Sequence, residues 1–142
     1  MKPFATFIIL LIFSSQLFSQ ELTKEATIGN WKVVNSQMIP KMLKGSDAKV
    51  KSKMEQMRKG FIGTIFSFGV NNRFTIKFAD NTPKFMKELE FLNNQQWIIQ
   101  KGQRIAIGSE KDGYSLMGII VRTLQGKKYF IIDECPFFLE VI

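Results

Sequence analysis

The chain has 142 residues, a formal net charge of +8, one cysteine and no histidine. A chain of this length forms one domain around one hydrophobic core. The single cysteine excludes an internal disulfide, and the absence of histidine removes the commonest general base and metal ligand. The hydrophobic content of 45% excludes an intrinsically disordered chain.

The first residues have the pattern of a secretory signal peptide. Lys2 gives a positive start, and an apolar stretch interrupted by a few polar residues extends from Phe4 to Phe18. The small residue Ser19 precedes the expected cleavage site. The alternative is a membrane anchor, but the apolar stretch is shorter than the ~20 residues that a helix needs to cross a bilayer. We therefore expect residues 1–19 to be a signal peptide.

The rest of the chain is expected to be a short linker, residues 20–27, followed by one domain, residues 28–142. A chain exported in this way is periplasmic or secreted. Cys135 has no partner cysteine in the chain. We predict that it is a small buried residue in a monomer, and the alternative is a disulfide between two copies.

The positive charge is concentrated in residues 31–61. This stretch contains eight basic and two acidic residues, a surplus of six. Within it, Lys49, Lys51 and Lys53 form a basic surface. Such a surface is explained either as a solvated helix face or as a contact with an anionic membrane surface, an anionic ligand or an envelope protein. Nucleic acid is not an expected partner of an exported chain.

The first predicted elements are a strand and a helical insertion. Residues 28–34 are rich in β-branched residues and predict a strand. A short helical turn is expected at residues 38–43. A longer helix follows, which Ser46 or Asp47 can cap and Gly60 can end.

The longer helix has one apolar side. Val50, Met54, Met57 and Phe61 are spaced by four, three and four residues, which places them on the same side of a helix. We interpret this stripe as core packing. The alternative is that Met54 and Met57 form a lid over a ligand.

After Gly60 the sequence predicts short strands joined by tight turns. In the first hairpin, alternation gives each strand one buried face: Phe66, Phe68 and Val70 on one strand, and Phe74, Ile76 and Phe78 on the other. A common buried face requires Phe68 opposite Phe74. This register predicts a three-residue loop, residues 70–72, with Asn72 in the left-handed conformation.

A second hairpin is predicted around Gly102. Alternation places Trp97 and Ile99 on one face, and a loop at residues 100–102 would pair Trp97 with Ile105. Between the two hairpins we predict one further strand at residues 86–92, for which a helical turn is the alternative.

The last hairpin is predicted from residues 114–124 and 127–133, around the turn at residues 125–126. A final strand at residues 137–142 is expected to pair with the first strand and close the sheet. The sequence therefore predicts a mainly β fold, an antiparallel up-and-down barrel of about eight to nine strands with a helical insertion after the first strand.

The opening of this domain resembles a known family. Gly29-Asn30-Trp31 is similar to the G-x-W signature of lipocalins, and the layout resembles small lipocalin-like domains of exported bacterial proteins, relatives of fatty-acid-binding proteins. The resemblance implies that Trp31 packs at the barrel floor under a late arginine. Arg122 is the only late arginine, a T-D-Y motif is absent, and residues 137–142 lack the R-x-Y clamp of fatty-acid-binding proteins.

Catalysis is not expected. Without histidine, Cys135 has no activating base, and the sequence shows no phosphate loop and no calcium loop. The acidic residues do not have the spacing of a catalytic carboxylate pair. We therefore predict a protein that is not an enzyme and that uses neither a metal nor another cofactor.

Two functions remain. The first, implied by the resemblance, is binding of a small hydrophobic or amphipathic ligand in the barrel, with Met54 and Met57 as the lid. The side chains expected to line that interior are Phe66, Phe68, Phe74, Ile76, Phe78, Trp97 and Ile99. The second is a barrel without a cavity that acts as an envelope interaction or accessory protein through its basic helical surface.

Overall fold

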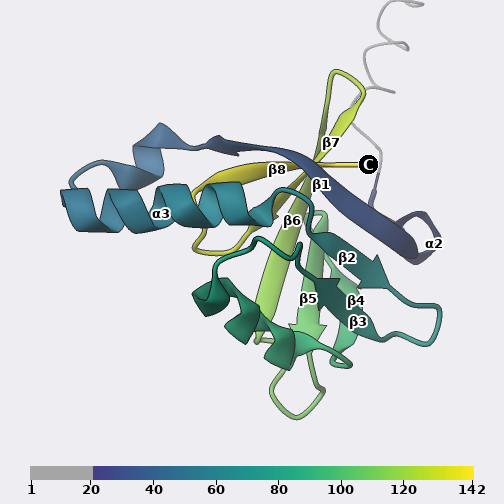
Figure 1. Cartoon of the computed structure of the whole chain (residues 1–142). Coiled ribbons are helices and arrows are strands. Elements are labelled where there is room, and N and C mark those ends of the chain that lie inside the picture. Colours follow the sequence, from purple (N-terminus) through teal and green to yellow (C-terminus); the bar gives the residue numbers. More distant parts are fainter. Residues whose placement is uncertain (1–20) are drawn as a thin grey trace, which may run out of the picture.

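The computed structural model describes residues 21–142, so the predicted signal peptide and its cleavage site lie outside the described residues. In chain order the elements are α2 (Lys24–Thr27), β1 (Gly29–Met38), η1 (Pro40–Leu43), α3 (Ala48–Phe61), β2 (Ile65–Phe68), β3 (Phe74–Lys77), η2 (Lys84–Leu92), β4 (Gln96–Gln100), β5 (Arg104–Gly108), β6 (Met117–Leu124), β7 (Lys127–Ile132) and β8 (Phe137–Val141). This confirms the predicted antiparallel barrel with a helix after its first strand (Figure 1). No helix in the described range is long and apolar enough to cross a membrane.

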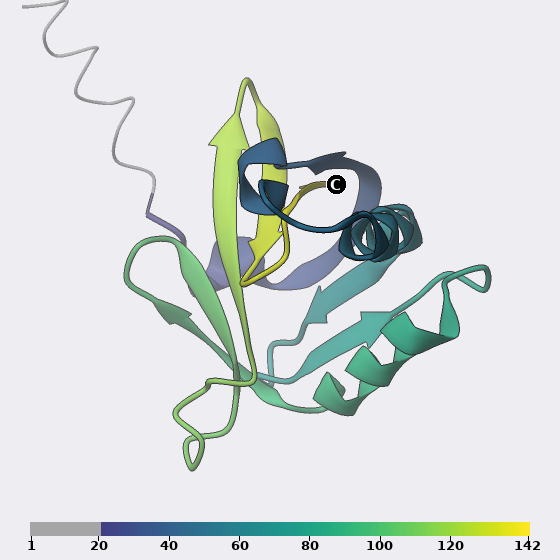
Figure 2. The ribbon, with the colours of Figure 1, turned by 90° about the vertical axis from the view of Figure 1, so that its left-hand side faces the viewer.

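The eight strands form one sheet in the order β3-β2-β1-β8-β7-β6-β5-β4. As predicted, β8 pairs with β1, and the two are the third and fourth strands of this order (Figure 2). The ends of the sheet, β3 and β4, meet at a single bridge between Arg73 and Gln96. Three backbone hydrogen bonds cross beside it: the Phe74 N–H donates to the Gln95 carbonyl at 2.8 Å, the Asn94 N–H to the Phe74 carbonyl at 2.8 Å, and the Trp97 N–H to the Asn72 carbonyl at 3.1 Å. The barrel is therefore nearly closed, with its seam between β3 and β4.

The predicted strand at residues 86–92 is wrong, because this segment is the 3-10 helix η2. Met86, Leu89 and Leu92 are three residues apart, which places them on one side of a helix with three residues per turn. All three are buried or half-buried. The Asn93 side chain, just after η2, accepts a hydrogen bond from the Ile76 N–H at 2.7 Å. It therefore satisfies a backbone amide of β3 that a neighbouring strand would otherwise satisfy.

The first hairpin has the predicted register. Phe68 pairs with Phe74, and the Gly69 N–H donates to the Arg73 carbonyl at 2.8 Å. Asn72 has a φ of 61°, the left-handed conformation expected for this loop.

The second hairpin differs from its predicted register by two residues. Trp97 pairs with Ile107, not with Ile105, and the loop comprises residues 101–103. Gln103 takes the left-handed conformation, with a φ of 61°. A shift of two residues leaves every side chain on the same face, so hydrophobic alternation does not distinguish the two registers.

The third hairpin turns where the sequence predicts. Leu124 pairs with Lys127, and the two residues between them have positive φ, 52° at Gln125 and 78° at Gly126. A two-residue turn with both φ angles positive matches the right-handed twist of the strands that it joins.

Helix α3 begins as predicted and ends one residue late. The Asp47 carboxylate caps it by accepting from the Val50 N–H at 2.8 Å. Gly60 is a helical residue and not the stop. A Cβ there would lie 2.3 Å from the Met86 Sδ, so the missing side chain lets η2 pack against the helix.

The helical turn before α3 is shorter than predicted. β1 extends to Met38, which pairs with Phe137, so η1 occupies only Pro40–Leu43. The pairing with β8 therefore keeps the chain extended beyond the predicted end of the first strand at residue 34.

Candidate functional site

The side chains predicted to line a ligand cavity do lie inside the barrel. The buried residues among them, none more than 8% exposed, are Phe66, Phe68, Phe74, Ile76, Phe78 and Trp97. Ile99 is half-buried and packs against the same core. The pattern of alternation thus placed these residues on the inner face.

These interior side chains pack against one another. The Phe68 ring centroid lies 5.3 Å from Trp97, 5.4 Å from Phe74 and 6.2 Å from Phe130. Phe66 lies 5.6 Å from Phe130 in an edge-to-face arrangement. Such distances are those of aromatic pairs in contact. The centre of the barrel is therefore occupied by rings, including Phe130, which the sequence analysis did not single out.

The Trp97 indole is also tied to the barrel wall. Its Nε1 donates to the Gly69 carbonyl at 3.2 Å, at the end of β2. This bond satisfies the one polar atom of a side chain that is otherwise surrounded by apolar atoms. Trp97 is thus a fixed part of the core.

Trp31 lies at one end of the barrel. Its Nε1 donates to the Thr27 carbonyl at 2.9 Å, and its ring centroid is 6.1 Å from Phe130. The lipocalin resemblance implied an arginine over this ring, but the cation there is Lys128, whose Nζ is 4.4 Å from the ring centroid. Arg122 is exposed. The crevice beside Trp31 is too narrow to admit a water molecule.

Met54 and Met57 are half-buried and pack against the hydrophobic core. Along the same stripe, Phe61 is fully buried, whereas Val50 is 41% exposed. The apolar stripe therefore packs on the barrel at the C-terminal end of α3 and is exposed to solvent at the N-terminal end of the helix. This gradient fits core packing for the second half of the helix.

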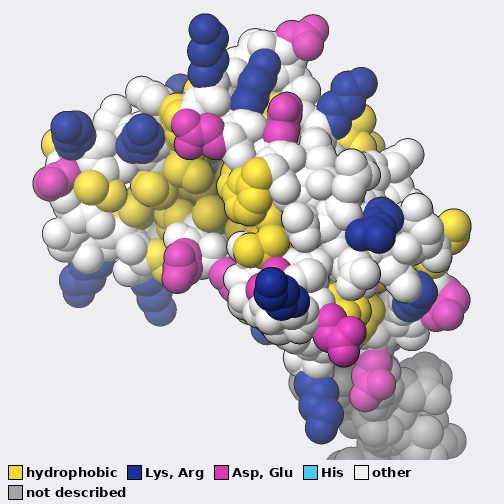
Figure 3. Space-filling model, turned by 90° about the horizontal axis from the view of Figure 1, so that it is seen from below, with side chains coloured by type: hydrophobic (Ala, Val, Ile, Leu, Met, Phe, Trp, Pro, Cys, Tyr) yellow, Lys and Arg dark blue, Asp and Glu magenta, His cyan; other side chains and the backbone are white. Residues whose placement is uncertain are grey.

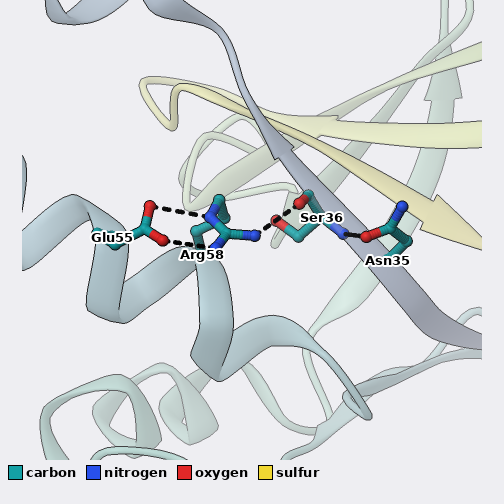
Figure 4. Close-up of polar contacts among 4 residues, drawn as sticks. All are labelled: Asn35, Ser36, Glu55 and Arg58. Atoms are coloured by element: carbon teal, nitrogen blue, oxygen red, sulfur yellow. Dashed lines mark hydrogen bonds and ion pairs between the residues drawn. The ribbon is translucent and has the colours of Figure 1, made fainter.

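The beginning of α3 and η1 extend to one side of the barrel (Figures 1 and 2). We call residues 38–53 the arm. Outside the arm, Arg58 attaches α3 to β1, because its Nη1 donates to the Ser36 carbonyl at 2.8 Å (Figure 4). The same guanidinium binds Glu55. Their side-chain hydrogen bond lowers the pKa of Glu55 and raises the pKa of Arg58.

The arm combines positive charge with exposed apolar side chains. It has five lysines and one acidic residue, a net charge of five minus one, or +4, and the acidic residue is the cap Asp47. The lysines are Lys41, Lys44, Lys49, Lys51 and Lys53. Met42 is 50% exposed. Seen from below, an apolar area lies at this end of the molecule, with both basic and acidic side chains around it (Figure 3).

The predicted basic surface therefore lies on this arm, although its members differ in their surroundings. Lys53 is held over the Phe85 ring of η2, with Nζ 4.2 Å from the centroid. No ion pair within residues 21–142 involves a lysine of the arm. The positive charge of the arm is thus not neutralised by ion pairs within the described residues.

A cleft of about 470 Å³ lies between η1 and α3. Its lining residues are Met38, Pro40, Lys41, Leu43, Lys44 and Lys51. The sequence predicted a helical turn at residues 38–43 but no groove beside it.

The chemistry of the described residues is limited. Burial raises the pKa of the Cys135 thiol to about 11, with smaller contributions from Glu134 and Asp133, so the nucleophilic thiolate is scarce at neutral pH. Within residues 21–142, no three His, Cys, Asp or Glu side chains are grouped to hold a metal ion.

Comparisons with protein-family models, curated proteins and solved structures gave no match. The lipocalin resemblance therefore rests on the opening motif and on the eight-stranded barrel, which is consistent with the calycin fold. Any function has to be argued from this chain alone.

Proposed function

We propose that this protein is a non-catalytic contact protein that, after export, docks through the arm on an anionic lipid surface. One observation carries the proposal: exposed apolar side chains lie among lysines that form no ion pair within residues 21–142, on an arm that projects from a filled barrel. The barrel is then a rigid base for the arm.

The barrel fold is also compatible with the other predicted function, a small ligand in the interior. A ligand there would have to separate rings that now contact each other, such as Phe68 and Trp97. Opening a space in a packed core costs several kcal/mol, roughly 3–5 for one phenylalanine. The interior therefore supports this function less well than the arm supports docking.

Only the first turn of α3 has a free apolar side, because Met54 and Met57 pack against the core and Val50 is 41% exposed. At 100° per residue, Lys51 lies on one side of Val50, and Lys49 and Lys53 lie on the other. An exposed apolar side chain with lysines on both flanks suits contact with the interface between water and lipid.

The expected affinity is modest. A lysine near an anionic membrane contributes about 1 kcal/mol, so five contribute on the order of 5 kcal/mol, equivalent to a Kd of about 0.1–1 mM. Insertion of Met42 and Val50 adds to this. Because salt shortens the range of charge interactions to about 3 Å at 1 M, binding should be reversible by salt.

The test is sedimentation of the mature protein with vesicles of phosphatidylglycerol and phosphatidylcholine, compared with phosphatidylcholine alone. We expect binding to the anionic vesicles only, and its loss in the triple variant Lys44→Glu, Lys49→Glu and Lys51→Glu. Lys53 is left unchanged because it contacts Phe85.

A matched control has the same change in net charge at exposed lysines outside the arm, Lys77→Glu, Lys101→Glu and Lys111→Glu. This control should retain most of the binding at low salt. Equal loss in both triple variants, or equal binding to the two kinds of vesicle, would contradict docking through the arm.

A further inference from the structure

We infer that the cleft between η1 and α3 binds one anionic lipid, with its head group among Lys41, Lys44 and Lys51 and its chain on the apolar floor. The inference rests on the proposed function and goes one step further, because it assigns a site for an individual molecule. General docking on a charged surface needs no such site.

Backbone hydrogen bonds hold the walls of the cleft in place. The Ile39 N–H donates to the Pro136 carbonyl at 2.7 Å, which attaches the start of η1 to the segment before β8. The Ser46 N–H donates to the Leu43 carbonyl at 3.0 Å and closes the turn that leads into α3. These two bonds fix the backbone on both sides of η1 and so hold the segment that lines the cleft.

The three lysines of the cleft come from both of its walls. Lys41 and Lys44 are three residues apart, the spacing that places side chains on one side of a 3-10 turn. Lys51 belongs to the second turn of α3. None of the three has an ion-pair partner within residues 21–142. An anion in the cleft would thus neutralise charge from two elements at once.

The floor of the cleft is apolar. Met38, Pro40 and Leu43 provide it, and the cleft, with a volume of about 470 Å³, is open to solvent along the surface. A purely inorganic anion would leave this floor exposed to water, and a neutral hydrocarbon would leave the lysines without a partner. A molecule with an anionic head and an apolar chain satisfies both.

The experiment uses hexyl, octyl and decyl phosphate as probes, each below the concentration at which it forms micelles. Binding is measured by calorimetry and by NMR shifts of the backbone amides. We expect shifts at residues 38–51 and an affinity that rises about fourfold for each added methylene until the floor is covered. Decanol, which lacks the charge, should bind at least tenfold more weakly than decyl phosphate.

Two variants identify the site. Leu43→Gln, on the floor, should weaken decyl phosphate binding about fivefold or more. Leu124→Gln is the matched control, because it is the same substitution at a leucine that is 53% exposed and lies outside both the cleft and the arm. It should bind decyl phosphate as the unchanged protein does.

Four outcomes would overturn the inference. Affinity independent of chain length would mean that the lysines bind only the head group, and docking on vesicles would still stand. Shifts centred on Trp97 would place the ligand in the barrel. Binding of decanoate but not of decyl phosphate, or of decyl phosphate without any binding to anionic vesicles, would exclude a membrane lipid as the ligand.

Discussion

Replacing Phe68 by alanine tests directly whether the barrel is filled. Phe68 is 1% exposed, and its ring contacts those of Phe74, Trp97 and Phe130. In a filled barrel the change removes all three contacts and leaves a cavity. In a barrel that holds a large empty cavity, the ring would line a space and its loss would change much less.

The expected magnitude follows from the burial and the contacts. Truncating a buried phenylalanine to alanine costs about 3–5 kcal/mol, and three aromatic partners place Phe68 in the upper half of that range. For a domain of about 120 residues, each kcal/mol corresponds to roughly 4 °C in Tm. We therefore expect Phe68→Ala to lower the free energy of unfolding by about 4–5 kcal/mol and Tm by about 15–20 °C.

The measurement is urea and thermal unfolding of the mature protein, followed by far-UV circular dichroism because the change also alters the surroundings of Trp97. Phe91→Ala is the matched control, since Phe91 is 60% exposed, and it should stay within about 0.5 kcal/mol. A loss below about 1.5 kcal/mol for Phe68→Ala would refute the filled interior.

Three further predictions concern the stability of the core and the attachment of α3 to β1. The Thr64 hydroxyl is buried without a hydrogen-bond partner among the described residues, so Thr64→Val should raise the free energy of unfolding by about 1 kcal/mol in urea titrations. Arg58→Gln removes the bond to the Ser36 carbonyl and should destabilise the attachment of α3 by about 1–2 kcal/mol, seen as faster amide exchange in the helix with little change in the strands. Burial raises the pKa of Cys135 from its ordinary value of 9.0 to about 11, so the stability that it contributes is complete below about pH 9 and is lost as the pH rises through about 11. Iodoacetamide at pH 8 should accordingly modify Cys135 much more slowly in the folded protein than in urea, and equal rates would contradict its burial.

Hydrophobic alternation predicted which face of each strand is buried. It predicted the register correctly only where the loop also contained a residue suited to the left-handed turn position. Around residues 70–72, Asn72 suits the left-handed position, and the register was correct. Around residues 101–103, Gln103 takes that position although glutamine has no preference for it. Since a shift of two residues keeps the faces unchanged, the sequence contained no signal against the wrong register.

The candidate site was predicted only in part. The lysines of α3 were evident from charge and helical spacing, because both are local properties of the chain. The cleft depends on where β1 ends, and that is decided by the pairing of Met38 with Phe137, almost 100 residues later. The 3-10 helix η2 was missed for a related reason: its core contacts include Gly60, whose missing side chain leaves room for Met86.

A filled barrel that presents the arm to a membrane should protect the arm alone when the protein binds. Hydrogen exchange followed by mass spectrometry, with and without anionic vesicles, measures this protection. We predict slower exchange in residues 38–53 and unchanged exchange in β4, β5 and β6. Slower exchange in those strands, with the arm unchanged, would contradict this prediction.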